Sequence, residues 1–312
     1  MTKFHEDQWA LILGGSSGFG LATAKKLAQE GMSVCIVHRD RKGAMERIEH
    51  EFDTIRARSK GFLALNVDAL SAEGISATID GLKTALGKTG KVRVLLHSIA
   101  FGNLKPIVGS SGHAGAASAL AQLAQELGAD PLKVSEAVER LFQAGVPQFH
   151  ALVPPVYGET LIEEEDMART VHSMGTSLLT WVQKVFSAGL FASDARVFGM
   201  TSEGNEVAWR GYAAVSAAKT AMEAVSRSIA VEFAPHGIRS NIIQAGVTET
   251  PALAAIPGNQ TMKAAARLRN PFGRLTVPED VANVIALLST DEAAWVNGAL
   301  IRVDGGEHVS AG

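Results

Sequence analysis

Residues 9–20 read WALILGGSSGFG, and this stretch decides the fold. Its first half, residues 9–14, is a short apolar run that ends in glycine, as in a buried strand of a parallel sheet. Apolar residues with helical spacing follow, because Leu21 and Ala24 share one face of residues 18–30. A buried strand, a glycine-rich turn and a helix in this order are typical of an α/β domain.

The alternation of strand and helix continues along the chain. Helices that join successive strands require right-handed crossovers, which make the strands parallel. The sequence therefore predicts one α/β domain over residues 1–312, with a doubly wound, seven-stranded parallel sheet of the Rossmann type. The expected strands are residues 9–14, 32–38, 61–67, 92–98, 195–200, 238–244 and 298–303. The expected helices are residues 18–30, 41–58, 71–86, 163–188, 210–233 and 278–289.

One long segment, residues 103–162, interrupts this alternation and contains no convincing strand. Helices are expected within it at Ala114–Leu127 and Leu132–Gln143. The segment is too long for an ordinary loop, so we interpret it as a helical insert. Because it follows the fourth strand, it emerges on the side where ligands bind, and we expect a lid over the site. Packing between subunits, or a purely structural elaboration, is the alternative.

Composition excludes several classes of protein. The net charge of -3 offers no basic surface for nucleic acid, so no such partner is expected. No apolar run approaches the ~20 residues of a membrane span, and residues 1–8 are too polar for a signal peptide. Cys35 is the only cysteine and the histidines lack metal-ligand spacing, so neither a disulfide nor a metal site is predicted. We therefore expect a cytoplasmic protein.

The glycine loop between the first strand and helix is a candidate phosphate site. Glycine permits a tight turn and close approach of the backbone to a ligand, and the helix N-terminus offers free N–H groups to a pyrophosphate. The loop thus predicts binding of a dinucleotide, whereas a glycine-rich turn without a ligand is the alternative. The residues assigned to this contact are Gly14, Ser16, Ser17, Gly18, Phe19 and Gly20.

The end of the second strand indicates which ribose the site accepts. His38 occupies the position where an acid would bind the 2′-hydroxyl of NAD, and Arg39 follows it. Arginine suits a 2′-phosphate, so we favour NADPH over NADH. A shift of register would instead make Asp40 the ribose acid. After the third strand, Asn66 and Val67 are expected beside the adenosine, although Asn66 could equally cap the next helix.

Tyr212 and Lys219 are the candidate catalytic pair. Seven residues make about two helical turns, so both side chains point the same way. An ammonium near a phenol favours its anion or strengthens it as a hydrogen-bond donor, and the lysine can also bind the nicotinamide ribose. A buried aromatic residue and a solvated helix charge are the alternative interpretation.

Together these motifs resemble the short-chain dehydrogenase/reductase family over nearly all of the chain outside the insert. Besides the glycine loop and the Tyr212/Lys219 pair, residues 241–250 (NIIQAGVTET) and the tail from 273 to 306 match. The resemblance implies that Ser98, Ile99 and Ala100 line the cofactor, and it also implies a homo-oligomer, often a homotetramer. It further implies that the backbone of Val247 holds the nicotinamide carboxamide, and that Thr248 and Thr250 approach the phosphates.

Two departures from the common family pattern resemble the enoyl-acyl-carrier-protein reductases. Six residues separate Tyr212 from Lys219, where most of the family has three, and residues 97–100 (HSIA) replace the usual Asn-Asn-Ala-Gly. The ordinary glycine loop resembles the branch that uses NADPH. The resemblance implies reduction of the 2,3 double bond of an acyl thioester, carried by acyl-carrier protein or by coenzyme A. A tyrosine shifted along its helix suits an enolate oxygen displaced from the carbon that receives hydride.

A third departure leaves other functions open. The usual enoyl reductase has a second tyrosine ten residues before the catalytic one, and here that position holds Ser202. Ser202 can share the carbonyl contact, as serine does in ketone-reducing relatives, or it can merely cap a turn. A carbonyl (3-oxoacyl) reductase is therefore one alternative. A non-catalytic NADPH sensor is another, against which the intact Tyr212/Lys219 pair weighs.

Overall fold

The computed structural model describes residues 3–109 and 114–311. Its seven strands form one parallel sheet in the order β3-β2-β1-β4-β5-β6-β7. This confirms the predicted doubly wound, seven-stranded sheet. The strands are β1 (Gln8–Leu13), β2 (Ser33–His38), β3 (Phe62–Asn66), β4 (Lys91–His97), β5 (Phe191–Ser202), β6 (Ile238–Ala245) and β7 (Leu300–Val303).

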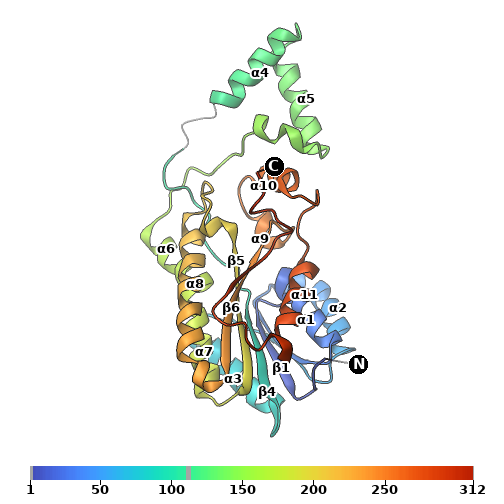
Figure 1. The fold of residues 1–312 in the computed structure, drawn as a ribbon. Helices are drawn as coiled ribbons and strands as arrows, with labels where there is room; N and C mark the ends of the chain where they lie inside the picture. Colours follow the sequence, from blue (N-terminus) through green and yellow to red (C-terminus); the bar gives the residue numbers. More distant parts are fainter. Residues whose placement is uncertain (1–2, 110–113, 312) are drawn as a thin grey trace.

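Helices cover both faces of the sheet (Figure 1). On one face α1, α2 and α11 pack around Phe52 and Leu27, and on the other α3, α7 and α8 pack around Trp181 and Met222. Strands buried on both sides explain the unbroken apolar runs of the sequence. The helices are α1 (Gly18–Gln29), α2 (Met45–Arg56), α3 (Ala72–Leu86), α4 (Ala114–Glu126), α5 (Pro131–Gln143), α6 (Glu164–Val171), α7 (Ser177–Ser187), α8 (Ala213–Glu232), α9 (Pro251–Ala254), α10 (Asn259–Arg269) and α11 (Pro278–Leu288).

The helix expected over residues 163–188 is three segments rather than one. Helix α6 ends at Val171, a π-helical turn occupies His172–Thr176, and α7 follows. Within the turn Gly175 lies against α8, so close that an added Cβ would stand 2.5 Å from the carbonyl oxygen of Ala218. The extra residue of the π turn thus accompanies a close contact between helices, which periodicity alone does not reveal.

Other bounds also differ from the prediction: β5 spans Phe191–Ser202 rather than 195–200, and α2 begins at Met45 rather than at 41. Helix α8 begins at Ala213 rather than at 210, because Gly211 has a φ of 76° and Tyr212 precedes the first helical residue. Helices α9 and α10 were not predicted; α10 buries only Ala264 and Ala266, so its apolar stripe is weak in the sequence. Both helices follow β6, on the side of the sheet where ligands bind in such folds.

The insert contains the two expected helices. Helices α4 and α5 form a hairpin that projects from the end of the molecule where α10 lies (Figure 1). Asp130 caps α5 by accepting a hydrogen bond from the amide of Leu132 at 2.8 Å. The chain then returns alongside α10, where the hydroxyl of Thr261 donates to the carbonyl of Val153 at 3.5 Å. No helix in the described part of the chain is long and apolar enough to cross a bilayer.

Candidate active site

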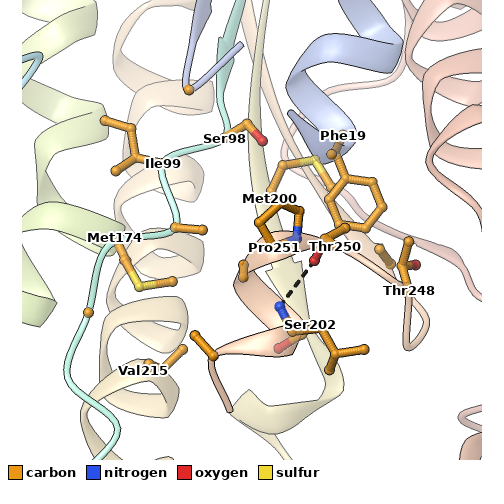
Figure 2. Close-up of a pocket in the computed structure, with 18 of the residues that line it drawn as sticks. Phe19, Ser98, Ile99, Met174, Met200, Ser202, Val215, Thr248, Thr250 and Pro251 are labelled. Carbon is orange, nitrogen blue, oxygen red and sulfur yellow. Dashed lines mark hydrogen bonds between the residues drawn. The ribbon is translucent and has the colours of Figure 1, made fainter. Parts of the chain in front are cut away.

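A cavity of about 640 Å³ lies beyond the carboxyl ends of strands β1 to β6, at the point where the strand order reverses. Residues far apart in the sequence meet there (Figure 2). Most of the residues predicted for the site line this cavity, whereas Gly20 and Asn66 do not. Those that line it are Gly14, Ser16, Ser17, Gly18, Phe19, Arg39, Val67, Ser98, Ile99, Ala100, Ser202, Tyr212, Lys219, Val247, Thr248 and Thr250.

The glycine loop brings backbone N–H groups to one end of the cavity. Gly14 has a φ of 84°, and an added Cβ would lie 2.5 Å from the carbonyl oxygen of Ser98. Ser17 precedes α1, and its side chain makes no capping hydrogen bond. The amides of the first turn thus remain available to an anion such as a pyrophosphate. Gly20 instead serves packing, because a Cβ there would stand 2.2 Å from the carbonyl oxygen of Gly14.

Arg39 lies at the end of β2, where the sequence predicts the adenosine ribose. Its guanidinium pairs with Asp68 at 2.6 Å and lies 4.7 Å from the ring centre of Phe101. Its side chain is half exposed, so it can reach a ligand. Asp40 does not line the cavity, because its carboxylate pairs with Nδ1 of the buried His38 at 2.9 Å.

Asn66 has a structural contact in place of the predicted one. Its side chain forms two hydrogen bonds with the backbone of Asp40, accepting from the amide at 3.0 Å and donating to the carbonyl at 3.1 Å. It therefore fixes the turn that carries Arg39, and it does not itself line the cavity. Val67, the next residue, lines the cavity as expected from its position after β3.

Tyr212 and Ser202 both line the cavity and approach one another there. The hydroxyl oxygens of the two residues lie 3.3 Å apart. Burial raises the pKa of Tyr212, and the hydrogen bond with Ser202 opposes this shift, so the phenol is protonated at neutral pH. Gly204 makes room for the ring, since a Cβ at this position would stand 2.4 Å from an edge carbon of Tyr212. The pair can therefore present two hydroxyl groups to one substrate oxygen.

Lys219 is buried on α8 and also lines the cavity. Burial lowers its pKa to about 8, and the charge of Glu223, one turn further along α8, acts in the opposite direction. Glu223 is held in place by the hydroxyl of Thr201, which donates to it at 2.8 Å, and by the amide of Asn205. An ammonium group that lines the cavity can donate hydrogen bonds to ribose hydroxyls.

The segment after β6 lies opposite the glycine loop. Thr250 accepts a hydrogen bond from the amide of Leu253 at 3.1 Å and so caps α9, as the dashed line in Figure 2 shows. A Cβ on Gly18 would lie 3.3 Å from its methyl group, so Thr250 stands beside the start of α1. The amide of Val247 donates to the buried carboxylate of Glu307 at 3.4 Å, a contact absent from the prediction.

The sequence analysis did not identify a further part of the cavity wall, which lies outside the predicted site residues. This wall is mostly apolar, and the ion pair between Glu203 and Arg269 is its charged part. Several of its residues belong to α9 and α10 or to the turn before α8, which carry no recognisable motif; their place after β5 and β6 was the signal that could have located them. The wall comprises Leu104, Met174, Glu203, Val207, Trp209, Val215, Leu253, Ile256, Met262, Ala265 and Arg269.

Comparison with known proteins adds two family matches. Residues 8–112 match the short-chain dehydrogenase family, and residues 150–308 match the family described as enoyl-(acyl carrier protein) reductase. The chain is 27% identical over 309 residues to cis-4-hydroxycyclohexanecarboxylate dehydrogenase of Sinomonas cyclohexanicum, covering 98% of both chains. It is also 27% identical over 308 residues to the probable 2,4-dienoyl-CoA reductase of Bacillus subtilis, covering 97% of both.

A solved structure shares the fold at lower sequence identity. The enoyl-[acyl-carrier-protein] reductase (NADH) of Aquifex aeolicus VF5 superimposes with a TM-score of 0.71, covering 98% of both chains. Its sequence is 19% identical. The likeness therefore shows a common arrangement of sheet and helices.

Proposed function

Because the chain belongs to the short-chain dehydrogenase/reductase family, and is thus an NAD(P)-dependent oxidoreductase, we propose that it reduces the 2,3 double bond of an enoyl thioester with NADPH. When bound, the reduced nicotinamide supplies the hydride. The observation that carries the proposal is the cluster of Ser202, Tyr212 and the buried Lys219 at the apolar end of one cavity.

The protein side chains have separate tasks in this reaction. Tyr212 donates a hydrogen bond to the carbonyl oxygen of the thioester, which gains negative charge as an enolate when hydride is added at C3. A proton that comes ultimately from solvent then adds at C2 and completes reduction of the double bond. Lys219 holds the ribose hydroxyls, and its positive charge favours the charged form of the tyrosine. The apolar wall, with Met174 and Val215, surrounds the acyl chain and keeps water from the reacting carbons.

Arg39 supports NADPH as the cofactor. Its half-exposed guanidinium can bind a 2′-phosphate bidentately, and Asp40, the alternative ribose acid, is engaged by His38. We predict that Arg39→Gln weakens NADPH binding about tenfold or more, with little effect on NADH, since a hydrogen bond to a charged group contributes about 1.5–3 kcal/mol. Fluorescence titration with both cofactors tests this. The exposed Arg58→Gln is the control, and an equal loss for NADPH and NADH would contradict the assignment.

A second candidate, reduction of a 3-oxoacyl thioester, is favoured by one contact. The 3.3 Å separation of the Ser202 and Tyr212 hydroxyls allows both to hold one carbonyl oxygen, which is the arrangement that ketone reduction needs. The acid then stands beside the oxygen that becomes the alcohol. In this case the hydride goes to the carbon bearing that oxygen.

The two reactions are separated by following NADPH absorbance with crotonyl thioester and with acetoacetyl thioester. We expect turnover of the crotonyl thioester, and loss of about a hundredfold or more in Tyr212→Phe with NADPH affinity unchanged. Turnover of the acetoacetyl thioester alone would favour the second candidate. Tight NADPH binding without turnover of either substrate would indicate a sensor of the cofactor.

The Ser202→Ala variant sharpens the comparison. If Ser202 holds a carbonyl oxygen jointly with Tyr212, removing its hydroxyl lowers kcat with acetoacetyl thioester by about tenfold or more. The same change affects crotonyl thioester less, because the enolate oxygen depends mainly on the tyrosine. Equal losses with both substrates would mean that Ser202 merely orients Tyr212.

A further inference from the structure

Glu307 is a buried acid in the C-terminal tail that the proposed reaction does not use. Its side chain is only 1% exposed, although it carries a carboxyl group. Glu307 does not line the cavity itself, but it lies against Gly246 and Val247, which do. A Cβ added to Gly246 would stand 3.0 Å from Oε2 of Glu307. Glu307 therefore affects the cavity only through the residues that it contacts.

One oxygen of Glu307, Oε1, accepts hydrogen bonds from two different segments. The amide of Val247, after β6, donates to it at 3.4 Å, and Nη2 of Arg269, on α10, donates at 3.2 Å. Both distances are long, because N–H groups usually lie about 2.7–2.9 Å from a carboxylate oxygen in charged pairs. Burial raises the pKa of Glu307, and these two contacts only partly oppose that shift. The carboxyl group is thus divided between two donors and bound tightly to neither.

The ion pair of Glu307 with Arg269 is only half formed. A guanidinium can bind a carboxylate through two parallel hydrogen bonds, and Nε–H and one N–H of Nη2 point the same way for this purpose. Here Nη2 is used, whereas Nε of Arg269 and Oε2 of Glu307 are both buried and have no hydrogen-bond partner among the described residues. The missing donor and the missing acceptor thus belong to the same two side chains. A rotation of the carboxylate would satisfy both.

Arg269 connects this pair to the wall of the cavity. Its side chain lines the cavity, and its Nη2 also donates a hydrogen bond to the carboxylate of Glu203. Glu203 lines the cavity too, and it directly follows Ser202 in the chain. A change in how Glu307 holds Arg269 therefore reaches the part of the wall that adjoins Ser202.

We propose that Glu307 is a positioning residue that links cofactor binding at Val247 to the Arg269–Glu203 pair in the cavity wall. The link rests on the proposed function and on the prediction that the amide of Val247 holds the nicotinamide carboxamide. The carboxamide then takes the donor that Glu307 holds only weakly. Glu307, released from Val247, turns to Arg269 and completes the bidentate pair. Arg269 is thereby fixed in the wall before the thioester binds.

Calorimetric titration with the cofactor tests the link without a substrate. In Glu307→Gln the side chain keeps its size and can still accept from Val247, but its amide nitrogen cannot accept from Nε–H of Arg269. We therefore expect NADPH and NADH each to bind about tenfold or more weakly, because the bidentate pair no longer forms on binding. Adenosine 2′,5′-bisphosphate, which has no nicotinamide, should bind as it does to the wild type. An equal loss for the bisphosphate would overturn the link, since it would show a general structural defect.

A double-mutant cycle shows whether Glu307 acts through Arg269. Arg269→Lys keeps the positive charge but lacks the planar fork, so it should lose about as much NADPH affinity as Glu307→Gln. The double variant should then bind NADPH no more weakly than either single variant. Arg267→Lys, an exposed change in the same last turn of α10, is the control and should bind NADPH normally. Additive losses, or normal NADPH binding by Glu307→Gln, would overturn the link.

A thioester that cannot be reduced extends the test to the cavity wall. Because coupling between two ligands is reciprocal, butyryl thioester should tighten NADPH binding several-fold in the wild type and not in Glu307→Gln. Equal tightening in both proteins would overturn the link to the wall. Turnover keeps the two proposals apart: a protein that reduces neither crotonyl nor acetoacetyl thioester sinks the proposed reaction, while the NADPH cycle still decides the role of Glu307. Turnover together with additive losses in the cycle would sink the role of Glu307 alone.

Discussion

Burial of Lys219 removes water from its ammonium group, and cofactor binding can compensate for this loss. Its side chain is only 6% exposed, so its ammonium has lost most of its hydration. The carboxylate of Glu223 compensates in part, which keeps the pKa at about 8 rather than lower. A dinucleotide whose ribose hydroxyls accept from this ammonium would supply the missing polar partners. The charge of Lys219 should therefore be linked to cofactor binding.

This linkage predicts how NADPH affinity depends on pH. Below about pH 8, Lys219 already carries its proton before NADPH binds, so its titration does not change the NADPH affinity. Above about pH 8 the free protein loses the proton that the complex needs, and affinity falls by up to about tenfold per pH unit until the complex also deprotonates. Fluorescence titrations from about pH 7 to about pH 9.5 measure this, within the range where the 2′-phosphate charge is constant. Lys219→Met should bind weakly with a flat profile, and parallel profiles for the two proteins would refute the linkage.

Single residues of the site were predictable where the contact is local. The turn at Gly14 to Gly20 forms between adjacent elements, so its sequence determines its shape. Asn66 shows the limit, because sequence position indicates closeness to the site but not which way a side chain turns. The pairing of Arg39 with Asp68 joins residues 29 positions apart, and such a contact follows only from the packing of β2 beside β3.

At the scale of elements, the π turn packs closely against α8 next to Lys219. Gly175 touches the carbonyl of Ala218, the residue just before Lys219. We predict that Gly175→Ala forces the two helices apart and lowers the free energy of unfolding by about 1–3 kcal/mol, since backbone atoms cannot yield as a side chain can. Urea denaturation measures this loss. Gly43→Ala, where an added Cβ meets nothing within 4 Å, is the control, and equal midpoints for both variants would contradict the prediction.

Elements were predictable where their apolar pattern is strong. The strands and the helices α1, α3 and α11 carry continuous or periodic apolar residues, and each overlaps its expected range, although β5 begins earlier and β7 later than predicted. The π turn and helix α10 were missed for opposite reasons. The π turn depends on how closely α8 approaches, which is a tertiary property, whereas α10 buries too few side chains to leave a pattern.

At the scale of the whole molecule, the sheet was predictable but the direction of the insert was not. A parallel sheet follows from strands joined by helical crossovers, and the right-handed rule applies to every such unit. Nothing comparable governs a helical hairpin, whose orientation depends on the few side chains it buries. Of the residues that the structure describes between 105 and 162, none lines the cavity. The lid therefore remains a hypothesis that a change within the hairpin can test.

The hairpin of α4 and α5 should unfold separately from the sheet and its helices. Its own core consists of Ala124, Val134, Val138 and Phe142, which is too small for a cooperative unit of high stability. We predict that Val138→Asp, which buries a charge, abolishes amide protection in both helices while NADPH affinity and the urea midpoint of the remaining chain stay unchanged. Hydrogen exchange followed by mass spectrometry localises the effect.

The matched control is Leu132→Asp, which introduces the same charge at a position on α5 that is 74% exposed, and amide protection should survive it. A lower midpoint for the whole chain in Val138→Asp would show that hairpin and sheet fold as one unit. Turnover of the thioester then tests whether the hairpin acts as a lid, because a lid excludes water only while it is folded. Loss of thioester turnover in Val138→Asp, with NADPH affinity intact and Leu132→Asp active, would place the hairpin over the acyl chain during the reaction. Unchanged turnover would leave packing between subunits, or a purely structural elaboration, as its role.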